Sequence, residues 1–366
     1  MLKLNYDKMV KGYYSVRHVL SYNRPLNAIT GPRGTTKSTS VALWVICYWY
    51  QNEQGWIYTR RDKDTTDGTA EDFIVNAVAI INMFYPDLQL NIEYKGGKPG
   101  KYYLTDKYRD EPVLCGFAVP LNLQAKYKGK NFSMCDWVVF DEFIKSADEH
   151  YGGGSKDITR EFVNLHQLMQ TADRGIGVLH RNKVRAICMG NNDSYFNPIY
   201  IAKGIDKYLR TETKFLAPKS EAYVVQQLSY ADCPNAEGYE DTMLYKLADD
   251  RTKDYAYRNI NKEASENEFI EDHDKDSLKP VCEMTFDNFH MVCYQYSDGL
   301  YIAPGTAPGR KRFALTLEDH TPDYNLPNSF NGYELIQIRR LYDRGKVRFK
   351  NHKCKYCLDN YFKYIV

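Results

Sequence analysis

The chain has 366 residues, of which 43% are hydrophobic and 26% are charged, and its formal net charge is +2. This length allows two or three domains with sizeable cores, and the nearly balanced charge excludes a uniformly basic or acidic protein. The charge is unevenly distributed, because residues 231–276 contain 14 acids and 6 Lys or Arg, whereas residues 339–366 contain 2 acids and 9 Lys or Arg. The basic end suits nucleic acid or an acidic protein surface, or is a solvated helix face.

The nine cysteines form no paired framework, which indicates reduced thiols. His352, Cys354 and Cys357 form an H-x-C-x-x-C cluster. Zinc would need a fourth ligand there, so metal binding at this cluster stays open. The longest apolar run, Val41–Tyr50, is shorter than the roughly 20 residues that span a bilayer, and Lys3–Lys11 lacks a signal pattern, so we expect no membrane association.

The first predicted strand, Leu26–Thr30, runs into a glycine-containing loop, and a helix-compatible segment follows. This strand–loop–helix order is typical of a phosphate-binding P-loop, in which backbone amides and the helix N-terminus face the phosphates of ATP. Lys37 would reach the β- and γ-phosphates, and the hydroxyl of Ser38 would ligate Mg²⁺. The residues predicted to bind ATP are Gly31, Arg33, Gly34, Thr35, Thr36, Lys37, Ser38 and Thr39.

The loop departs from the usual pattern G-x-x-x-x-G-K-[ST], because Thr36 stands where the second glycine belongs. Pro32 also removes one amide donor, and Gly34 is expected to supply part of the missing flexibility. The alternative interpretation is a turn that happens to contain a lysine.

The next segments alternate between strand and helix patterns, which predicts an α/β domain with a largely parallel sheet. The predicted elements are a strand at Trp56–Arg60, a helix at Asp72–Phe84, a hairpin at Leu88–Tyr108, and a strand at Val113–Val119.

A buried strand at Trp137–Phe140 ends in Asp141 and Glu142, about 100 residues after the loop. This is the pattern of a Walker B pair, in which Asp141 would hold the Mg²⁺ shell and Glu142 would activate water. The alternative is an acidic turn. A predicted helix at Ile158–Asp173 precedes a strand at Val184–Met189, after which Asn191 could sense the γ-phosphate or serve as an ordinary turn residue.

The pattern changes after residue 198. The predicted elements there are a charged helix at Asp241–Glu263, strands at Phe289–Tyr296, Leu300–Ala303 and Arg312–Leu317, a helix at Tyr333–Tyr342 and a strand at Val347–Phe349.

Several runs in order resemble the DNA-packaging ATPase of small podophages, of the Picovirinae and Salasmaviridae type. They are LSYNRPLNAITGPRGTTKS, YTRRDK, VVFDEF and VRAICMGNNDSYFNP, with the weaker NGYELIQIRRLYDRGKVRFKN near the end. The resemblance implies an N-terminal additional-strand (ASCE) P-loop ATPase domain at 1–203 and a helical linker or lid at 204–270. It further implies an α+β RNase H-like domain without a nuclease site at 271–366.

The resemblance also implies a homo-oligomeric ring motor, usually a pentamer, that drives double-stranded DNA through the portal into a procapsid. Such a motor works in the host cytoplasm, at the portal vertex, and use of a packaging RNA stays open. Carried over by motif, Lys37, Ser38, Asp141, Glu142 and Asn191 form the ATPase site. Arg174, with Arg181 as its competitor, and Lys63 would act across the subunit interface.

Lysines on two segments are candidates for contacting the DNA backbone, although for each lysine singly a solvated surface position is the commoner outcome. They are Lys126, Lys128 and Lys130 before the Walker B strand, and Lys98 and Lys101 on the hairpin.

The C-terminal domain is expected to lack nuclease activity, because a two-metal nuclease needs converging carboxylates. The best candidate for its first strand, Met291–Tyr296, contains no acid, and Asp298, Glu318 and Asp319 lie outside it. The rival hypotheses are a terminase with a working nuclease and a nucleotide-binding scaffold that does not hydrolyse ATP.

Overall fold

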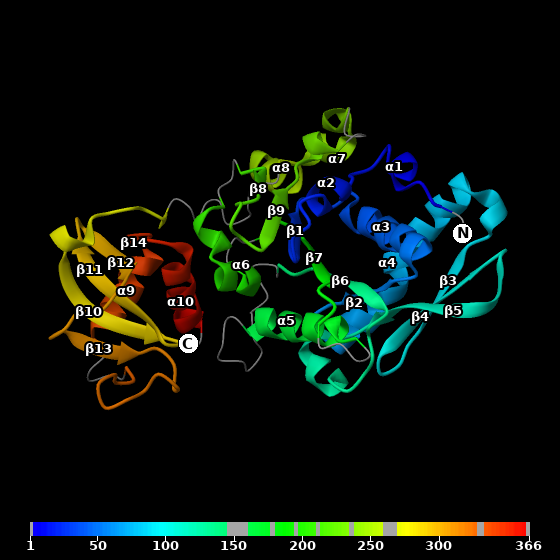
Figure 1. Ribbon diagram of the computed structural model, residues 1–366. Coiled ribbons are helices and arrows are strands. Elements are labelled where there is room, and N and C mark those ends of the chain that lie inside the picture. Colours follow the sequence, from blue (N-terminus) through cyan, green and yellow to red (C-terminus); the bar gives the residue numbers. More distant parts are fainter. Residues whose placement is uncertain are drawn as a thin grey trace. The chain divides into compact units, whose positions relative to one another are not determined.

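The computed structural model describes residues 3–144, 160–175, 180–193, 197–209, 213–233, 238–258, 269–327 and 333–363. The chain divides into two compact units, each built on its own β-sheet (Figure 1). Among the described residues, no helix has the length and apolar character that crossing a membrane requires.

The first unit contains a nine-stranded sheet in the order β3-β4-β5-β2-β6-β7-β1-β9-β8. The strands from β5 to β9 in this order are parallel, and antiparallel strands β3, β4 and β8 lie at the edges. Their bounds are β1 Leu26–Thr30, β2 Gly55–Thr59, β3 Asn91–Lys95, β4 Gly100–Asp106, β5 Arg109–Ala118, β6 Cys135–Asp141, β7 Arg185–Gly190, β8 Phe215–Leu216 and β9 Tyr223–Gln227. Since β7 lies between β1 and β6, it is the additional strand that the sequence predicted.

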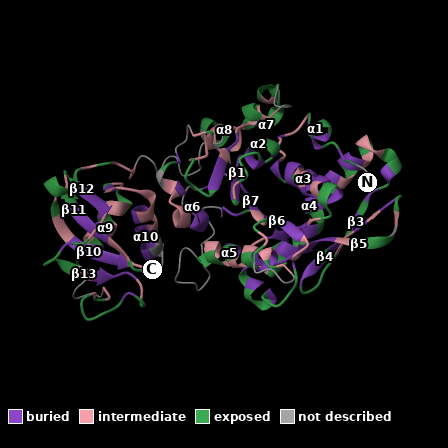
Figure 2. Ribbon diagram, viewed as in Figure 1, coloured by how far each residue is buried: buried purple, intermediate pink, exposed green. Residues whose placement is uncertain are grey.

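Helices cover this sheet, and its central strands are buried on both faces, as parallel strands require (Figure 2). The helix α3 packs on α4 and β2, and α5 packs on β6. The helices before residue 260 are α1 Tyr6–Met9, α2 Arg17–Leu20, α3 Lys37–Asn52, α4 Lys63–Phe84, α5 Arg160–Asp173, α6 Pro198–Lys203, α7 Met243–Leu247 and α8 Asp250–Ala256.

Two predicted helices differ from those observed. The helix α4 begins at Lys63 rather than at Asp72, because the Asp62 side chain caps it by accepting the amide N–H of Thr65 at 2.9 Å. The single helix predicted at 241–263 is wrong: the described part forms the short helices α7 and α8. The chain leaves the helical conformation at Ala248, and Asp249 caps α8.

The second unit contains a five-stranded sheet in the order β13-β10-β11-β12-β14, with α9 and α10 packed into its core. The strands β10, β11 and β12 are antiparallel, and β13 and β14 add parallel edges. The bounds are β10 Lys279–Phe286, β11 Phe289–Tyr296, β12 Gly299–Pro304, β13 Lys311–Ala314, β14 Val347–Phe349, α9 Tyr333–Asp343 and α10 His352–Lys363. The mixed sheet agrees with the predicted α+β class.

The first strand of this sheet is β10, so the prediction that placed the first strand at Met291–Tyr296 is wrong. This matters because β10 carries a fully buried acid, Glu283.

The three predicted domain ranges, 1–203, 204–270 and 271–366, stay a prediction. Residues 204–270 do not form a purely helical segment, since β8 and β9 come from this range and join the first sheet beside β1.

Candidate functional site

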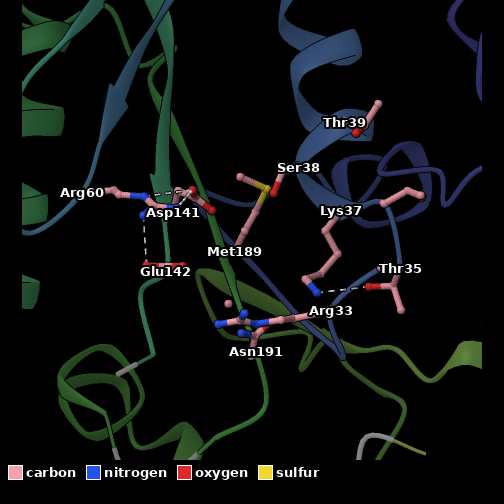
Figure 3. Close-up of a pocket in the computed structure, with 13 residues that line it drawn as sticks. Arg33, Thr35, Lys37, Ser38, Thr39, Arg60, Asp141, Glu142, Met189 and Asn191 are labelled. Carbon is pink, nitrogen blue, oxygen red and sulfur yellow. Dashed lines mark hydrogen bonds and ion pairs between the residues drawn. The ribbon is translucent and has the colours of Figure 1, made fainter. Parts of the chain in front are cut away.

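A cavity of about 380 Å³ opens at the carboxyl ends of β1, β6 and β7. Its volume lies in the range of roughly 300–1,000 Å³ that is usual for ligand sites. The cavity brings together the three predicted motifs and one further residue, Arg60 (Figure 3). The lining residues are Arg33, Gly34, Thr35, Thr36, Lys37, Ser38, Thr39, Arg60, Asp141, Glu142, Met189, Gly190 and Asn191.

The loop after β1 contains two residues in the left-handed conformation, Gly34 and Thr36. Thr36, the residue before α3, has φ 58° and ψ 20°, a left-handed conformation that glycine adopts without steric cost. The structure therefore shows why a glycine is usual here. The Thr36 hydroxyl accepts the Tyr14 amide N–H at 3.1 Å. Gly34 has φ 83°, and a Cβ at this position would overlap the Tyr230 hydroxyl.

Lys37 lies against the loop itself. Its Nζ donates to the carbonyl oxygens of Gly31 at 2.7 Å and Pro32 at 2.8 Å, and to Thr35 Oγ1 at 3.1 Å. Burial lowers the pKa of Lys37 to about 8, although the negative charge of Asp141 opposes the shift. A phosphate bound in the loop would compete with these oxygens and would favour the charged ammonium.

Arg60 bridges Asp141, the last residue of β6, and Glu142, which follows it (Figure 3). Its Nη2 lies 2.6 Å from Asp141 Oδ2, and its Nη1 lies 3.1 Å from Glu142 Oε2. The Tyr58 hydroxyl also donates to Asp141, at 3.0 Å. Carboxylate and hydroxyl oxygens are ligands that Mg²⁺ prefers, so Asp141 and Ser38 fit a magnesium site at the cavity wall.

The role of Arg60 escaped sequence reasoning, which placed this residue only at the end of a strand. The signal lies in the register, because Thr59 of β2 pairs with Phe140 of β6. Because β2 and β6 are parallel and end at the same level, the residues that come after this pair, Arg60 and Asp141, lie side by side.

Arg61 holds the chain that follows Glu142. It donates to the carbonyl oxygens of Glu142 and Phe143, and its Nε lies 2.7 Å from Glu161 Oε2 on α5. Since both members of this ion pair are mostly buried, the contact fixes the turn that carries the predicted general base.

The two candidate trans-acting arginines lie in different environments, and neither lines the cavity. Arg181 pairs with buried Asp136 at 2.9 Å and donates to the carbonyl oxygens of Cys135 and Ala172. Arg174 follows α5 and is exposed, with a long contact of 3.5 Å to the Lys128 carbonyl oxygen. Lys63 is half-exposed at the start of α4 and lies 3.5 Å from Asp67.

Comparison with known proteins agrees with this geometry. A model of the podovirus DNA encapsidation protein (Gp16) family matches residues 7–365. The chain belongs to this family. It is 26% identical to the DNA packaging proteins of Bacillus phages PZA and phi29, over 93% of this chain and 93% of each relative.

Solved structures of packaging motors share the fold of this Gp16 family member. The phi-29 viral genome packaging motor assembly contains a chain with a TM-score of 0.70 and 22% identity, over 96% of this chain and 99% of that one. The phi-28 gp11 DNA packaging motor has a TM-score of 0.57 and 16% identity, over 95% and 97% of the two chains.

The predicted DNA-binding lysines are all exposed, but they do not line the cavity at the ends of β1, β6 and β7. Lys126 lies in the 3₁₀ helix Leu121–Tyr127, and Lys128 and Lys130 follow it. Lys98 and Lys101 lie at the tip of the β3–β4 hairpin. Their contact with DNA stays a prediction.

The carboxylates of the second unit are occupied by protein donors. Glu283 accepts the Ala307 amide N–H at 2.8 Å and the Tyr324 hydroxyl, and Arg312 Nε lies 3.5 Å away. Asp319 accepts two backbone amides at 2.8 and 2.9 Å.

Among the described residues, no three or more His, Cys, Asp or Glu side chains are grouped so that they could hold a metal ion. The thiols of Cys354 and Cys357 are buried in the core of the second unit, and burial raises the pKa of both.

Proposed function

We propose that this protein is the ATPase of a genome-packaging motor, which hydrolyses ATP and uses the energy to move double-stranded DNA into a procapsid. The observation that carries the proposal is the cavity in which Lys37, Ser38, Asp141 and Glu142 meet. Membership of the DNA encapsidation family and the fold shared with the phi-29 motor assembly support the step from ATPase to packaging.

The residues divide the chemistry of hydrolysis between them. The loop amides and the N-terminus of α3 bind phosphate oxygens, and Lys37 leaves the loop carbonyls to reach the β- and γ-phosphates. Ser38 and Asp141 would hold Mg²⁺, which neutralises phosphate charge. Glu142 orients the attacking water and takes its proton. Asn191 reports the γ-phosphate from the tip of β7.

Arg60 must release the acids for this chemistry to proceed. Its guanidinium contacts the same oxygens of Asp141 and Glu142 that hydrolysis requires. Release of Arg60 would thus accompany binding of Mg²⁺ and ATP.

Subunits of a ring, five in the motors that this sequence resembles, would complete each other's sites. Arg174 suits the trans role, because it is exposed and lacks an acidic partner among the described residues, whereas Arg181 neutralises Asp136. Lys63 would act at the same interface. The ring would sit on the portal in the host cytoplasm, and a packaging RNA is a further possible partner.

DNA would be held by lysines 126, 128 and 130 and by the hairpin lysines 98 and 101, through phosphate contacts that weaken as salt rises. The rival functions are not favoured. The buried acids of the second unit are saturated by protein donors, which argues against a nuclease. Glu142 lines the ATP cavity, which argues against an inert scaffold.

The substitution Glu142→Gln tests the proposal directly. We expect it to preserve ATP binding and to reduce turnover by about 10²- to 10⁴-fold, the usual contribution of a general base. Phosphate release with procapsids and DNA measures turnover, and DNA protected from nuclease measures packaging. The exposed Glu111→Gln is the matched control. Turnover of Glu142→Gln equal to that of Glu111→Gln would contradict the assignment.

A further inference from the structure

A second cavity, of about 270 Å³, lies in the first unit near the amino ends of β6 and β7. The first cavity lies at the carboxyl ends of these strands. Trp137 near the start of β6 and Arg185 at the start of β7 form part of its wall. The wall also contains Trp44 and Tyr48 of α3 and Arg17 of α2. None of these residues lines the ATP cavity.

Three aromatic rings make the apolar wall. Trp44 and Tyr48 are four residues apart on α3 and so share a helix face. Trp137 meets Trp44 edge-on at 6.2 Å between centroids and meets Tyr48 edge-on at 5.5 Å. The indole N–H groups of Trp44 and Trp137 are buried and have no hydrogen-bond partner in the described part of the chain. The rings, and not these enclosed N–H groups, are therefore the surface that the wall offers to a ligand.

The charged groups of the wall are cationic. Arg17 and Arg185 line the cavity, and none of the lining residues that the structure describes is an acid. Arg185 lies over the Trp137 ring at 6.0 Å. Two carboxylates contact residues of the wall: Asp7 pairs with Arg17, and Asp136 accepts the Tyr48 hydroxyl at 2.9 Å and pairs with Arg181 at 2.9 Å. A bound phosphate would therefore compete with Asp7 for Arg17.

We propose that this cavity binds a single unpaired nucleotide, with the base against the aromatic wall and the phosphate at Arg17 and Arg185. Bases stack on aromatic rings and on guanidinium planes, and arginine binds phosphate oxygens with two donors. The volume is below the roughly 300–1,000 Å³ of drug-sized sites, which suits one base rather than a longer ligand. The ligand chemistry is the same in a free mononucleotide and in a single strand.

The site is separate from ATP hydrolysis, so the proposal does not depend on the proposed function. The cavity is nevertheless linked to the P-loop through α3, whose first residue is Lys37. The Tyr6 hydroxyl lies 2.7 Å from the hydroxyl of Ser40 near the start of this helix, and the Tyr6 ring contacts Trp44.

The test uses the full-length protein carrying Lys37→Met, so that the first cavity lacks the ammonium for phosphate and no competing nucleotide has to be added. The probes are AMP, a six-nucleotide RNA and a six-nucleotide DNA, and binding is followed by tryptophan fluorescence, since Trp44 and Trp137 form the wall. We expect quenching, and at least about fivefold weaker binding in Arg185→Gln and Trp44→Leu, the lower end of the effect of losing one stacked contact. Arg17→Gln, at an exposed position, should act in the same direction without affecting folding.

The matched control is Lys183→Gln, which removes an exposed charge two residues from Arg185 and outside the cavity wall. Equal binding of AMP and the oligonucleotides would identify a free nucleotide as the ligand, whereas binding of the oligonucleotides alone would identify a single strand. Two results would overturn the proposal: quenching by none of the probes, or equal affinities of Arg185→Gln, Arg17→Gln and Lys183→Gln when all three melt like the wild type.

Discussion

Backbone conformation at single residues determines whether the phosphate loop can form. Thr36 adopts the left-handed conformation, and a hydrogen bond from the Tyr14 amide helps to hold it there. Gly34 tolerates substitution less well than Thr36. Its φ of 83° is unfavourable for residues with a side chain, and a Cβ at this position would overlap the Tyr230 hydroxyl. Whether a position in this loop accepts a residue other than glycine therefore depends on the neighbouring group: the Tyr14 amide stabilises Thr36, and the Tyr230 hydroxyl leaves no room at Gly34.

Gly34→Ala should destabilise the protein by about 1–2 kcal/mol, the cost of a left-handed alanine, and should weaken ATP binding. The same change at Gly68, in the exposed middle of α4 with open space around its Cα, should instead stabilise by up to about 1 kcal/mol. Thermal unfolding and nucleotide titration measure both variants. Equal effects of the two substitutions would show that the loop backbone differs from the one described.

The buried Lys37 ammonium should lower stability when no phosphate is bound. Its folded pKa of about 8 lies below the ordinary lysine value of 10.5, so below pH 8 the folded state must bury a charge. The unfolded chain binds more protons between these values, so stability should rise as pH rises from about 8 to 10.5.

Lys37→Met should therefore stabilise the nucleotide-free protein at pH 7, by up to about 3 kcal/mol at 1.36 kcal/mol per pKa unit, while abolishing ATP turnover. Its advantage over the wild type should shrink as the pH approaches 10. Denaturant unfolding at pH 7 and pH 10 provides the measurement. If the variant is less stable than the wild type at pH 7, burial of the Lys37 ammonium does not destabilise the nucleotide-free protein.

At the scale of elements, the buried acid of β10 in the second unit is held by protein donors. Glu283 lies in the middle of β10 and contributes to a network that joins β10, β11 and β13. His290 Nδ1 and Arg312 Nε lie 3.6 and 3.5 Å from its carboxylate. A fully buried acid that accepts from several donors stabilises the pairing of these strands. Removing the acid leaves the donors without an acceptor.

Glu283→Ala should destabilise the second unit by about 1–3 kcal/mol, because it leaves the buried Ala307 amide without its acceptor. Asp298→Ala should change stability little, since Asp298 is mostly exposed and its pair with Lys346 is at the surface. The full chain should leave supercoiled plasmid intact with Mg²⁺ or Mn²⁺. Metal-dependent nicking that Glu283→Ala abolishes would instead support an active nuclease.

At the scale of the whole molecule, the two candidate arginines are expected to have different roles. Arg181 should stabilise its own subunit, whereas Arg174 should act on the site of a neighbouring subunit. Arg181→Gln should destabilise the protein by about 3–5 kcal/mol, because it leaves Asp136 buried without its partner. Arg174→Gln should leave the melting temperature unchanged and stop turnover.

Subunit mixing should then recover partial turnover when Arg174→Gln and Glu142→Gln proteins are combined, since some interfaces would pair an intact arginine with an intact glutamate. Phosphate release as a function of the mixing ratio provides the measurement. Full turnover by Arg174→Gln alone would move the trans role to another residue.

The sequence by itself predicted the ATPase half well, because the relevant signals are local. A buried strand followed by a glycine loop, and a second buried strand followed by two acids, specify conformation and chemistry within a few residues of each other. The structure confirms β1 with its predicted bounds and brings Asp141 and Glu142 to the cavity.

Only the tertiary structure decided the features that depend on strand order and on distant partners. Arg60 reaches Asp141 across 81 residues, and Arg181 reaches Asp136 across 45. The assignment of the first strand of the second unit failed because Pro280 and Glu283 interrupt the apolar pattern of β10, and only its pairing with β11 and β13 shows that it belongs to the sheet. The second cavity draws its wall from two helices and two strand starts. No local pattern records such convergence, because it is produced by the packing of elements far apart in the chain.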